Sequence, residues 1–189
     1  MGPASKPLKE KGPLLLRGAV IGLALVVGVV AWLATRDDDE TSSSPSVAAE
    51  ARIVSEEELA ELSTDAGQSV YWAGPIDGTV LEATELAEQS GVQVRYLEEG
   101  VEAGSGEVAV LTVGSYPLAD PAGAVDGLAA RPGAIVRTSD DGRTVVTNSE
   151  QPTSVYFASP DNSVQVEVYD PSPARALRLA LSPRVRPAD

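Results

Sequence analysis

The feature that most constrains this chain is an apolar run near its start, from Leu14 to Thr35, interrupted by a single charge at Arg17. The run holds 22 residues. As a helix rising about 1.5 Å per residue it would reach about 33 Å, and a bilayer's hydrocarbon core is about 30 Å thick. We therefore predict a transmembrane helix over residues 14–35, with the lipid bilayer as its partner.

The charges that flank this run predict its orientation. All three lysines lie in a short basic tail, residues 1–13, whereas four consecutive acids follow Arg36. Because flanks rich in Lys and Arg stay in the cytoplasm, we expect a cytoplasmic N-terminus and an extracytoplasmic C-terminal part. The alternative is a cleaved secretory signal, but such signals have shorter apolar regions followed by small residues, and Trp32 and Leu33 are bulky. The favoured localisation is thus the cell membrane, with a single pass.

The part of the chain beyond the predicted span is strongly acidic. Residues 37–189 contain 27 acids and nine arginines, with no lysine or histidine, and the whole chain lacks cysteine. This charge repels nucleic acid, so no nucleic-acid partner is expected. Without those side chains, serine cannot be activated through His or Lys, and both thiol chemistry and zinc sites built from Cys and His are excluded for this part of the chain. We expect no metal and no cofactor.

Two segments follow the span. Residues 36–54 are acidic, rich in serine and poor in apolar residues, which predicts a disordered linker. Residues 55–187 are long enough for one extracytoplasmic domain. That domain opens with a helix, because Ser55 and Glu58 match a capping box, and Val54 and Leu59 occupy the positions of a hydrophobic staple.

The rest of the domain alternates between short strands and two further helices, which predicts an α+β fold: a mostly antiparallel sheet with about three short helices. A hairpin is expected from two strands joined through residues 74–78. The unbroken apolar run 108–113 predicts a central strand buried on both faces. Helices are expected at 120–130 and 172–181, the latter with Ala174, Leu177 and Leu181 on one face. The expected strands are 69–73, 79–86, 92–97, 108–113, 134–138, 143–148, 153–158 and 164–169.

Five stretches of this domain are distinctive: Val70-Tyr71-Trp72-Ala73-Gly74-Pro75, Val94-Arg95-Tyr96-Leu97, Leu111-Thr112-Val113-Gly114-Ser115-Tyr116-Pro117, Pro152-Thr153-Ser154-Val155-Tyr156 and Val166-Glu167-Val168-Tyr169-Asp170-Pro171-Ser172-Pro173. Together they resemble a group of small single-span envelope proteins of high-GC Gram-positive (actinobacterial) bacteria. The resemblance covers residues 55–187, and the group has no assigned activity. It therefore implies a topology, domain limits and an envelope association, and it carries over no functional residue.

Carboxylates are the reactive groups that remain. Two of them about 5–10 Å apart in a cleft can hydrolyse glycosidic bonds. Glu82, Glu167 and Asp170 lie within or at the end of apolar strands, but strand alternation is expected to turn the two glutamates towards solvent, and Asp170 suits a local turn or cap. Asp140-Asp141-Gly142 and Asp161 could suggest calcium, although hairpin turns explain them well.

Two groups of side chains are candidates for ligand binding. Tyr71 and Trp72 could form an aromatic platform, although core packing is the favoured reading of Trp72. Arg175 and Arg178, with Arg184 and Arg186, could hold a phosphate-bearing envelope polymer or an acidic protein partner. The favoured alternative is that the first two pair with the acidic body and the others lie at the helix C-terminus.

The favoured function is a non-catalytic, membrane-anchored binding or interaction module of the cell envelope. The alternative is a carboxylate-dependent hydrolase of envelope glycan.

Overall fold

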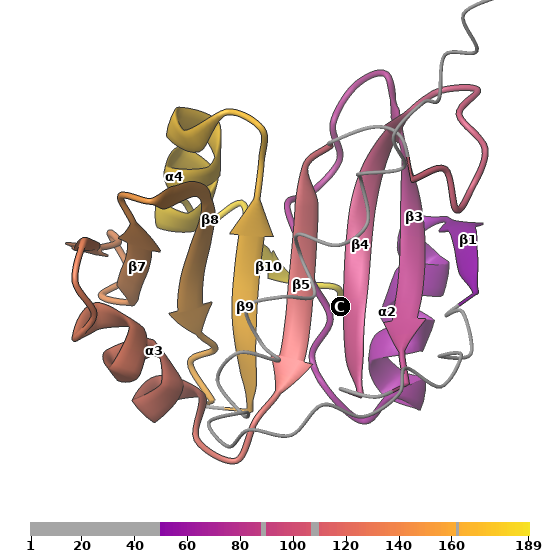
Figure 1. The fold of residues 1–189 in the computed structure, drawn as a ribbon. Coiled ribbons are helices and arrows are strands. Elements are labelled where there is room, and N and C mark those ends of the chain that lie inside the picture. The colour runs from indigo at the N-terminus through magenta and orange to yellow at the C-terminus, as the bar shows by residue number, and fades with distance from the viewer. Residues whose placement is uncertain (1–49, 88–89, 107–109, 162) are drawn as a thin grey trace, which may run out of the picture.

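The computed structural model describes residues 50–87, 90–106, 110–161 and 163–189, which form one α+β domain (Figure 1). The predicted cytoplasmic tail, the predicted transmembrane helix at 14–35 and the linker up to residue 49 lie outside the described residues. In the part of the chain that is described, no helix is long and apolar enough to cross a membrane.

An eight-stranded sheet organises the domain, and all its neighbouring strands run antiparallel. Its order is β1-β3-β4-β5-β9-β8-β7-β6, so β1, β3, β4 and β5 supply one half and β6–β9 the other, joined where β5 pairs with β9. The strands are β1 (Ala51–Val54), β3 (Thr79–Leu86), β4 (Gly91–Glu98), β5 (Thr112–Pro117), β6 (Ala134–Thr138), β7 (Thr144–Asn148), β8 (Gln151–Ala158) and β9 (Val164–Tyr169).

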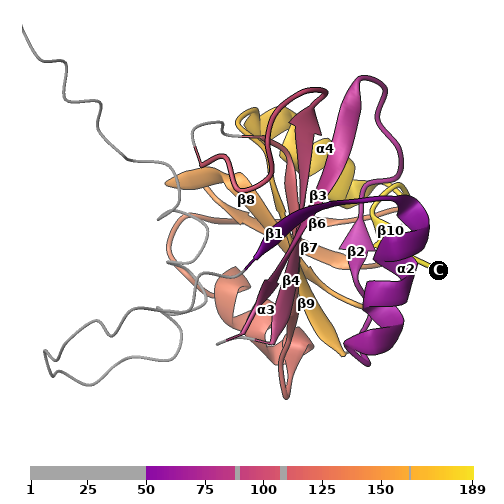
Figure 2. The same cartoon turned by 90° about the vertical axis from the view of Figure 1, so that its right-hand side faces the viewer.

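The two faces of this sheet are covered differently. We call the face that carries Val94, Val113 and Val166 the first face; it packs against α2 (Glu56–Asp65), α4 (Pro173–Leu181) and a small sheet of β2 (Tyr71–Trp72) with β10 (Arg186–Pro187). The opposite, second face packs against α3 (Pro121–Ala129) over β6–β9. Figure 2 shows α2, β2 and β10 on one side of the sheet and α3 on the other. The main apolar core therefore lies on the first face.

Local sequence signals set the helices. In α2 the Ser55 side chain accepts a hydrogen bond from the Glu58 backbone N–H, and the Glu58 carboxylate accepts one from the Ser55 N–H, so the predicted capping box is present. Asp120 caps α3 through the Gly123 N–H, as expected from the Asp-Pro pair. In α4 the buried residues are Ala176, Leu179 and Ala180. Leu177 and Leu181, two of the three residues predicted to share a face, are partly buried and pack against the main core, whereas Ala174 is exposed.

The domain begins earlier than predicted. Ala51–Val54 forms edge strand β1, which pairs with β3, so the end of the predicted linker belongs to the sheet. Val54 and Leu59, the expected staple pair, are both buried. The apolar positions at 51, 53 and 54 are too few for a strand signal; pairing with β3 supplies the missing stabilisation.

The predicted hairpin between residues 69–73 and 79–86 was wrong. β3 has the expected bounds, but Tyr71–Trp72 pairs with Arg186–Pro187, more than 100 residues away in the chain. The backbone N–H of Tyr71 instead donates to the Ser115 hydroxyl at 2.8 Å, and that of Ala73 to the Tyr96 hydroxyl at 2.6 Å. Hydroxyl groups of buried side chains on the first face thus accept the hydrogen bonds of these two backbone N–H groups.

The central strand is present but shifted along the chain. Val110 and Leu111 of the predicted run precede the strand, and residues 108–109 lie outside the described residues. β5 covers Thr112–Pro117, and every residue of it up to Tyr116 is buried. Gly114 allows this, because a Cβ at this position would lie 2.5–2.7 Å from the Tyr116 ring and hydroxyl. The Tyr116 side chain therefore lies over the backbone of Gly114 in the same strand.

Candidate functional site

The two predicted aromatic ligand residues are part of the core. Tyr71 is 3 % exposed and packs edge-on against Phe157, with ring centroids 6.0 Å apart. Trp72 is 4 % exposed, and the Arg186 guanidinium lies 5.4 Å from its ring centroid. The favoured reading of Trp72 as a core residue is confirmed. Neither ring offers a face on which a ligand could stack, because β10 and the first face enclose them.

The C-terminal arginines are largely engaged within the domain. Arg175 forms an ion pair with Asp170 at 2.9 Å, and the other oxygen of Asp170 accepts a hydrogen bond from the Ser172 N–H at 2.8 Å, which confirms a local role for that acid. Arg184 donates to the Pro75 carbonyl at 3.2 Å. Arg178 is exposed in the last turn of α4 and has no ion pair among the described residues.

The prediction that Arg184 and Arg186 lie at the C-terminus of the helix was wrong, because their guanidinium groups contact the Pro75 carbonyl and the Trp72 ring. Arg143 lies at this C-terminus instead, since its guanidinium donates to the carbonyl of Ser182, the C-cap of α4, and lies 4.4 Å from the Phe157 ring centroid. This contact joins β7 to the end of α4 and has no signal in the sequence. An arginine cluster that could hold a phosphate polymer is not assembled.

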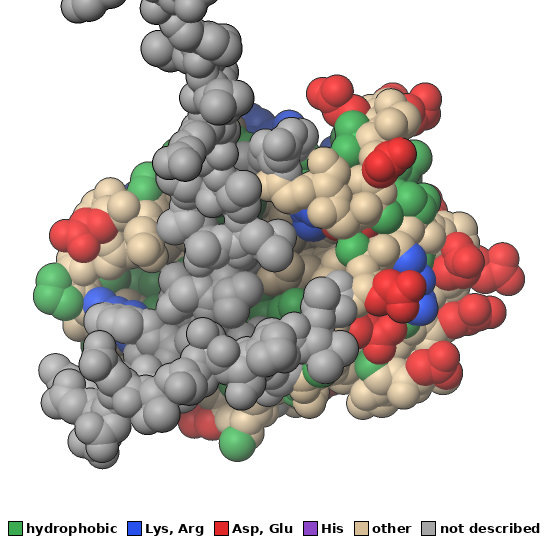
Figure 3. Space-filling view, turned by 45° about the vertical axis from the view of Figure 1, so that its right-hand side comes forward, with side chains coloured by type: hydrophobic (Ala, Val, Ile, Leu, Met, Phe, Trp, Pro, Cys, Tyr) green, Lys and Arg blue, Asp and Glu red, His purple; other side chains and the backbone are tan. Residues whose placement is uncertain are grey.

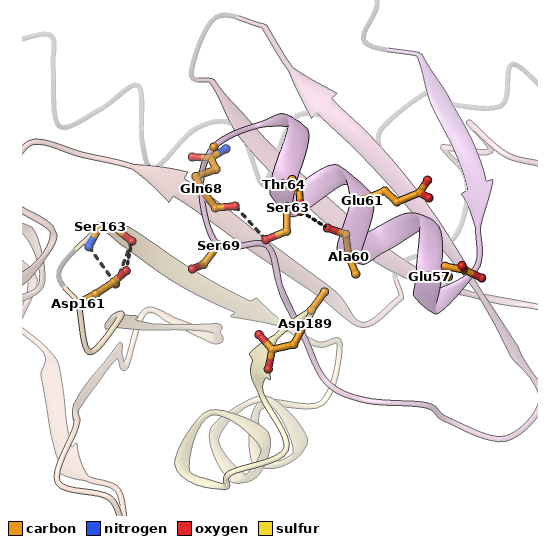
Figure 4. Close-up of a pocket in the computed structure, with 12 residues that line it drawn as sticks. Glu57, Ala60, Glu61, Ser63, Thr64, Gln68, Ser69, Asp161, Ser163 and Asp189 are labelled. Carbon is orange, nitrogen blue, oxygen red and sulfur yellow. Dashed lines mark hydrogen bonds between the residues drawn. The ribbon is translucent and has the colours of Figure 1, made fainter.

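A groove of about 670 Å³ lies between α2 and the loop that joins β8 to β9 (Figure 4). Figure 4 shows Asp161 and Ser163 on one side, α2 on the other and Asp189 between them. Four acids and no arginine line the groove, whose residues are Glu57, Ala60, Glu61, Ser63, Thr64, Gly67, Gln68, Ser69, Asp161, Ser163, Ala188 and Asp189. Helical spacing places Glu57 and Glu61 one turn apart on α2, and both are exposed.

The electrostatics of this groove are those of a cation-attracting surface. Hydrogen bonds from the Ser159 and Ser163 side chains hold the pKa of Asp161 below its usual value, so this acid stays ionised near neutral pH. Figure 3 shows further acidic side chains crowding the side of the molecule that carries β1, β3 and α2. A positively charged ligand would be attracted to this side, and an anionic one repelled.

The loop acids form hairpin turns. Ser139 and Asp141 both accept from the Arg143 N–H, and Ser159 and Asp161 both accept from the Ser163 N–H. The two loops thus repeat one Ser-x-Asp arrangement, in which the serine hydroxyl also donates to the aspartate. No group of three or more possible metal ligands occurs in the described ranges. The turn interpretation of these acids is confirmed.

Glu82 does not face solvent, contrary to the prediction. It is fully buried on the second face, where its carboxylate forms an ion pair with Arg95 at 2.7 Å and accepts a hydrogen bond from the Gly104 N–H at 2.6 Å. Arg95 also donates to the Ser105 carbonyl at 2.9 Å. The alternation that exposes one strand face in many antiparallel sheets fails here, because the loop at residues 104–105 folds over that face. The charged groups of Glu82 and Arg95 are thus both engaged in contacts within the domain.

Glu167 is likewise buried, at 2 % exposure, although strand alternation predicted a solvent-facing side chain. The Tyr156 hydroxyl donates to its carboxyl group at 3.0 Å and the Tyr116 hydroxyl at 3.4 Å, and Gln93 donates to Tyr116 at 3.0 Å. Burial raises the pKa of Glu167, outweighing the hydroxyl groups of Ser154, Tyr156 and Tyr116 that lower it. The Glu167 carboxyl group on β9 thus contacts hydroxyl groups from β5 and β8, and Gln93 of β4 contacts one of those hydroxyl groups.

The two buried glutamates are too far apart to act as a glycosidase pair. They lie on the same face of β3 and β9, with β4 and β5 between them. Strand spacings of about 4.8 Å place them about 14 Å apart across the sheet alone, beyond the roughly 5–10 Å range of paired catalytic carboxylates. The groove holds neither of them.

Sequence reasoning missed the groove acids Glu57, Glu61 and Asp189, and it weighed Asp161 only as a calcium candidate. Glu57 and Glu61 lie on the exposed side of a helix and Asp161 lies in a hairpin turn, both ordinary places for solvated acids. Only the folded chain brings them to one concavity. No family model matches this chain, and no curated protein or solved structure matches it.

Proposed function

We propose that this chain is a membrane-anchored, extracytoplasmic binding module of the cell envelope, and that its acidic groove binds a positively charged segment of a protein partner. The observation that carries the proposal is the groove itself, whose lining contains four acids and no arginine. Residues 1–13 and the apolar run 14–35 supply the orientation and the anchor, and the resemblance to envelope proteins supplies the compartment.

Charge decides between a cationic and an anionic partner. Three of the four C-terminal arginines that could have held an anion are used inside the domain: Arg175 with Asp170, Arg184 with Pro75 and Arg186 with Trp72. Arg178 is exposed, and it is not among the residues that line the groove. The groove acids, in contrast, are exposed and pair with no arginine among the described residues. A partner with Lys or Arg side chains would therefore meet available carboxylates rather than occupied ones.

A binding role also suits the side-chain inventory better than catalysis does. General acid–base work near neutral pH needs a group that titrates there, and the chain beyond residue 36 has no His, Cys or Lys. Glu167 has a raised pKa, but two tyrosine hydroxyl groups enclose it away from the groove. We therefore infer a module that recognises rather than transforms its ligand.

The test is binding of a ten-residue lysine peptide to the full chain in detergent, measured by titration calorimetry at several salt concentrations. Glu57→Lys combined with Glu61→Lys should weaken binding about tenfold or more. Each surface ion pair contributes up to about 1 kcal/mol, and about 1.4 kcal/mol is a tenfold change in affinity.

The matched control is Glu98→Lys combined with Glu99→Lys, which changes the net charge equally at exposed positions outside the groove. This control should weaken binding much less. Equal losses in the two variants would show that the peptide responds to overall charge, and the groove would then not be its site.

A further inference from the structure

The most unusual group in this domain is the buried acid Glu167, and the function proposed above does not use it. It lies on β9, directly opposite Gly114 of β5 and Tyr156 of β8. β5 and β9 are the strands at which the two halves of the sheet join. A single carboxyl group thus lies at that junction and contacts tyrosines from both neighbouring strands.

No cation compensates this acid among the described residues. The ion pairs of the described domain involve Glu82, Glu85, Asp141 and Asp170, and the cation that β4 places on the second face, Arg95, is engaged by Glu82. The titratable groups facing Glu167 are Tyr116 from β5 and Tyr156 from β8, both kept neutral because burial raises their pKa values.

The remaining elements near Glu167 contribute no compensating charge. From α3, which also packs on β9, the buried residues are apolar, and its acids Asp120 and Asp126 are exposed. β4 contributes the neutral amide of Gln93, which donates to Tyr116. An ionised carboxylate in such surroundings is strongly disfavoured and protonates instead.

We propose that Glu167 is a buried proton switch: protonated, it holds β5, β8 and β9 together, and ionised, it weakens the junction between the two halves of the sheet. The neutral acid fits between two hydroxyl groups that can each donate or accept a hydrogen bond. A charged carboxylate at this depth recruits water, and admitting water requires that the enclosing Tyr116 and Tyr156 move, which loosens the contacts of β9 with β5 and β8.

The sign of the pH dependence follows from the pKa of Glu167, which burial raises in the folded state above the ordinary glutamate value of 4.5. The stabilisation is fully present below the unfolded-state value and is lost as pH rises through the folded-state value. Within that window the unfolding equilibrium constant should rise by up to about tenfold for each pH unit, since one proton is released.

The experiment compares the full chain in detergent with its Glu167→Gln variant, which keeps the shape of the neutral acid and cannot ionise. Urea unfolding is measured from pH 5 to pH 8, and hydrogen exchange locates the opening. The wild type should lose stability with rising pH more steeply than Glu167→Gln. Its protection should fall in β5 and β9 before it falls in the β6–β7 hairpin. Glu85→Gln, an exposed acid on β3, is the matched control and should retain the wild-type dependence.

Equal pH slopes in the wild type and Glu167→Gln would overturn the proposal, and so would loss of protection spread evenly over the sheet. If Glu167→Gln does not fold, the wild-type chain labelled with ¹³C at glutamate carboxyl carbons gives the answer directly. Titration of the Glu167 carboxyl carbon above the ordinary glutamate pKa of 4.5 supports the switch, and an ionised carboxylate at and below that pH refutes it.

Discussion

Replacement of Gly114 by alanine tests the packing that places β5 at the centre of the sheet. An added Cβ would lie 2.5 Å from the Tyr116 hydroxyl oxygen and 2.6 and 2.7 Å from two atoms of its ring. These distances are well below van der Waals contact, and the ring is a rigid side chain at 2 % exposure. Overpacking of a core by one methyl group costs about 1–3 kcal/mol, and we expect the upper half of this range because the Tyr116 contacts to Gln93 and Glu167 must also shift.

The assay is urea unfolding followed by far-ultraviolet circular dichroism, in four chains: wild type, Gly114→Ala, Tyr116→Ala and the double variant. Gly114→Ala should cost about 2–3 kcal/mol in the wild-type background and less than about 1 kcal/mol in the Tyr116→Ala background, where the clashing ring is absent. Gly127→Ala is the control: nothing lies within 4 Å of its Cβ, and helix propensity predicts a gain of up to about 1 kcal/mol. A cost at Gly114 that persists without the Tyr116 ring would refute the reasoning.

Two further predictions concern the aromatic core and the anchor. Trp72→Ala should destabilise the domain by about 3–5 kcal/mol in the same unfolding assay, because the indole is buried; a loss below about 1 kcal/mol would place the ring outside the core. A reporter enzyme that works only outside the cytoplasm should be active when fused after Asp189, and inactive after Lys→Glu changes at all three lysines of residues 1–13 together with Arg17→Glu invert the orientation signal. Purification of a mature chain that begins beyond Thr35 would contradict the uncleaved anchor.

Elements whose signals are local could be predicted from the sequence alone. The capping box at Ser55 fixes the start of α2, and Asp120 fixes that of α3, because a helix end is satisfied by side chains within a few residues. The two hairpins β6–β7 and β8–β9 were also predictable, since their turn residues lie between alternating strands. The α+β class follows from these elements together.

Contacts between residues far apart in the chain could not be predicted, because they depend on how the elements pack in the folded domain. Pairing of β2 with β10 and burial of Glu82 and Glu167 depend on what covers each face of the sheet, and alternation along a strand carries no information about that cover. The groove likewise arises where α2 meets the β8–β9 loop, two segments about 100 residues apart. The sequence does not distinguish one acid from another, because the environment of each depends on neighbours that come together only on folding. The fold places Glu57, Glu61, Asp161 and Asp189 in the groove and buries Glu82 and Glu167.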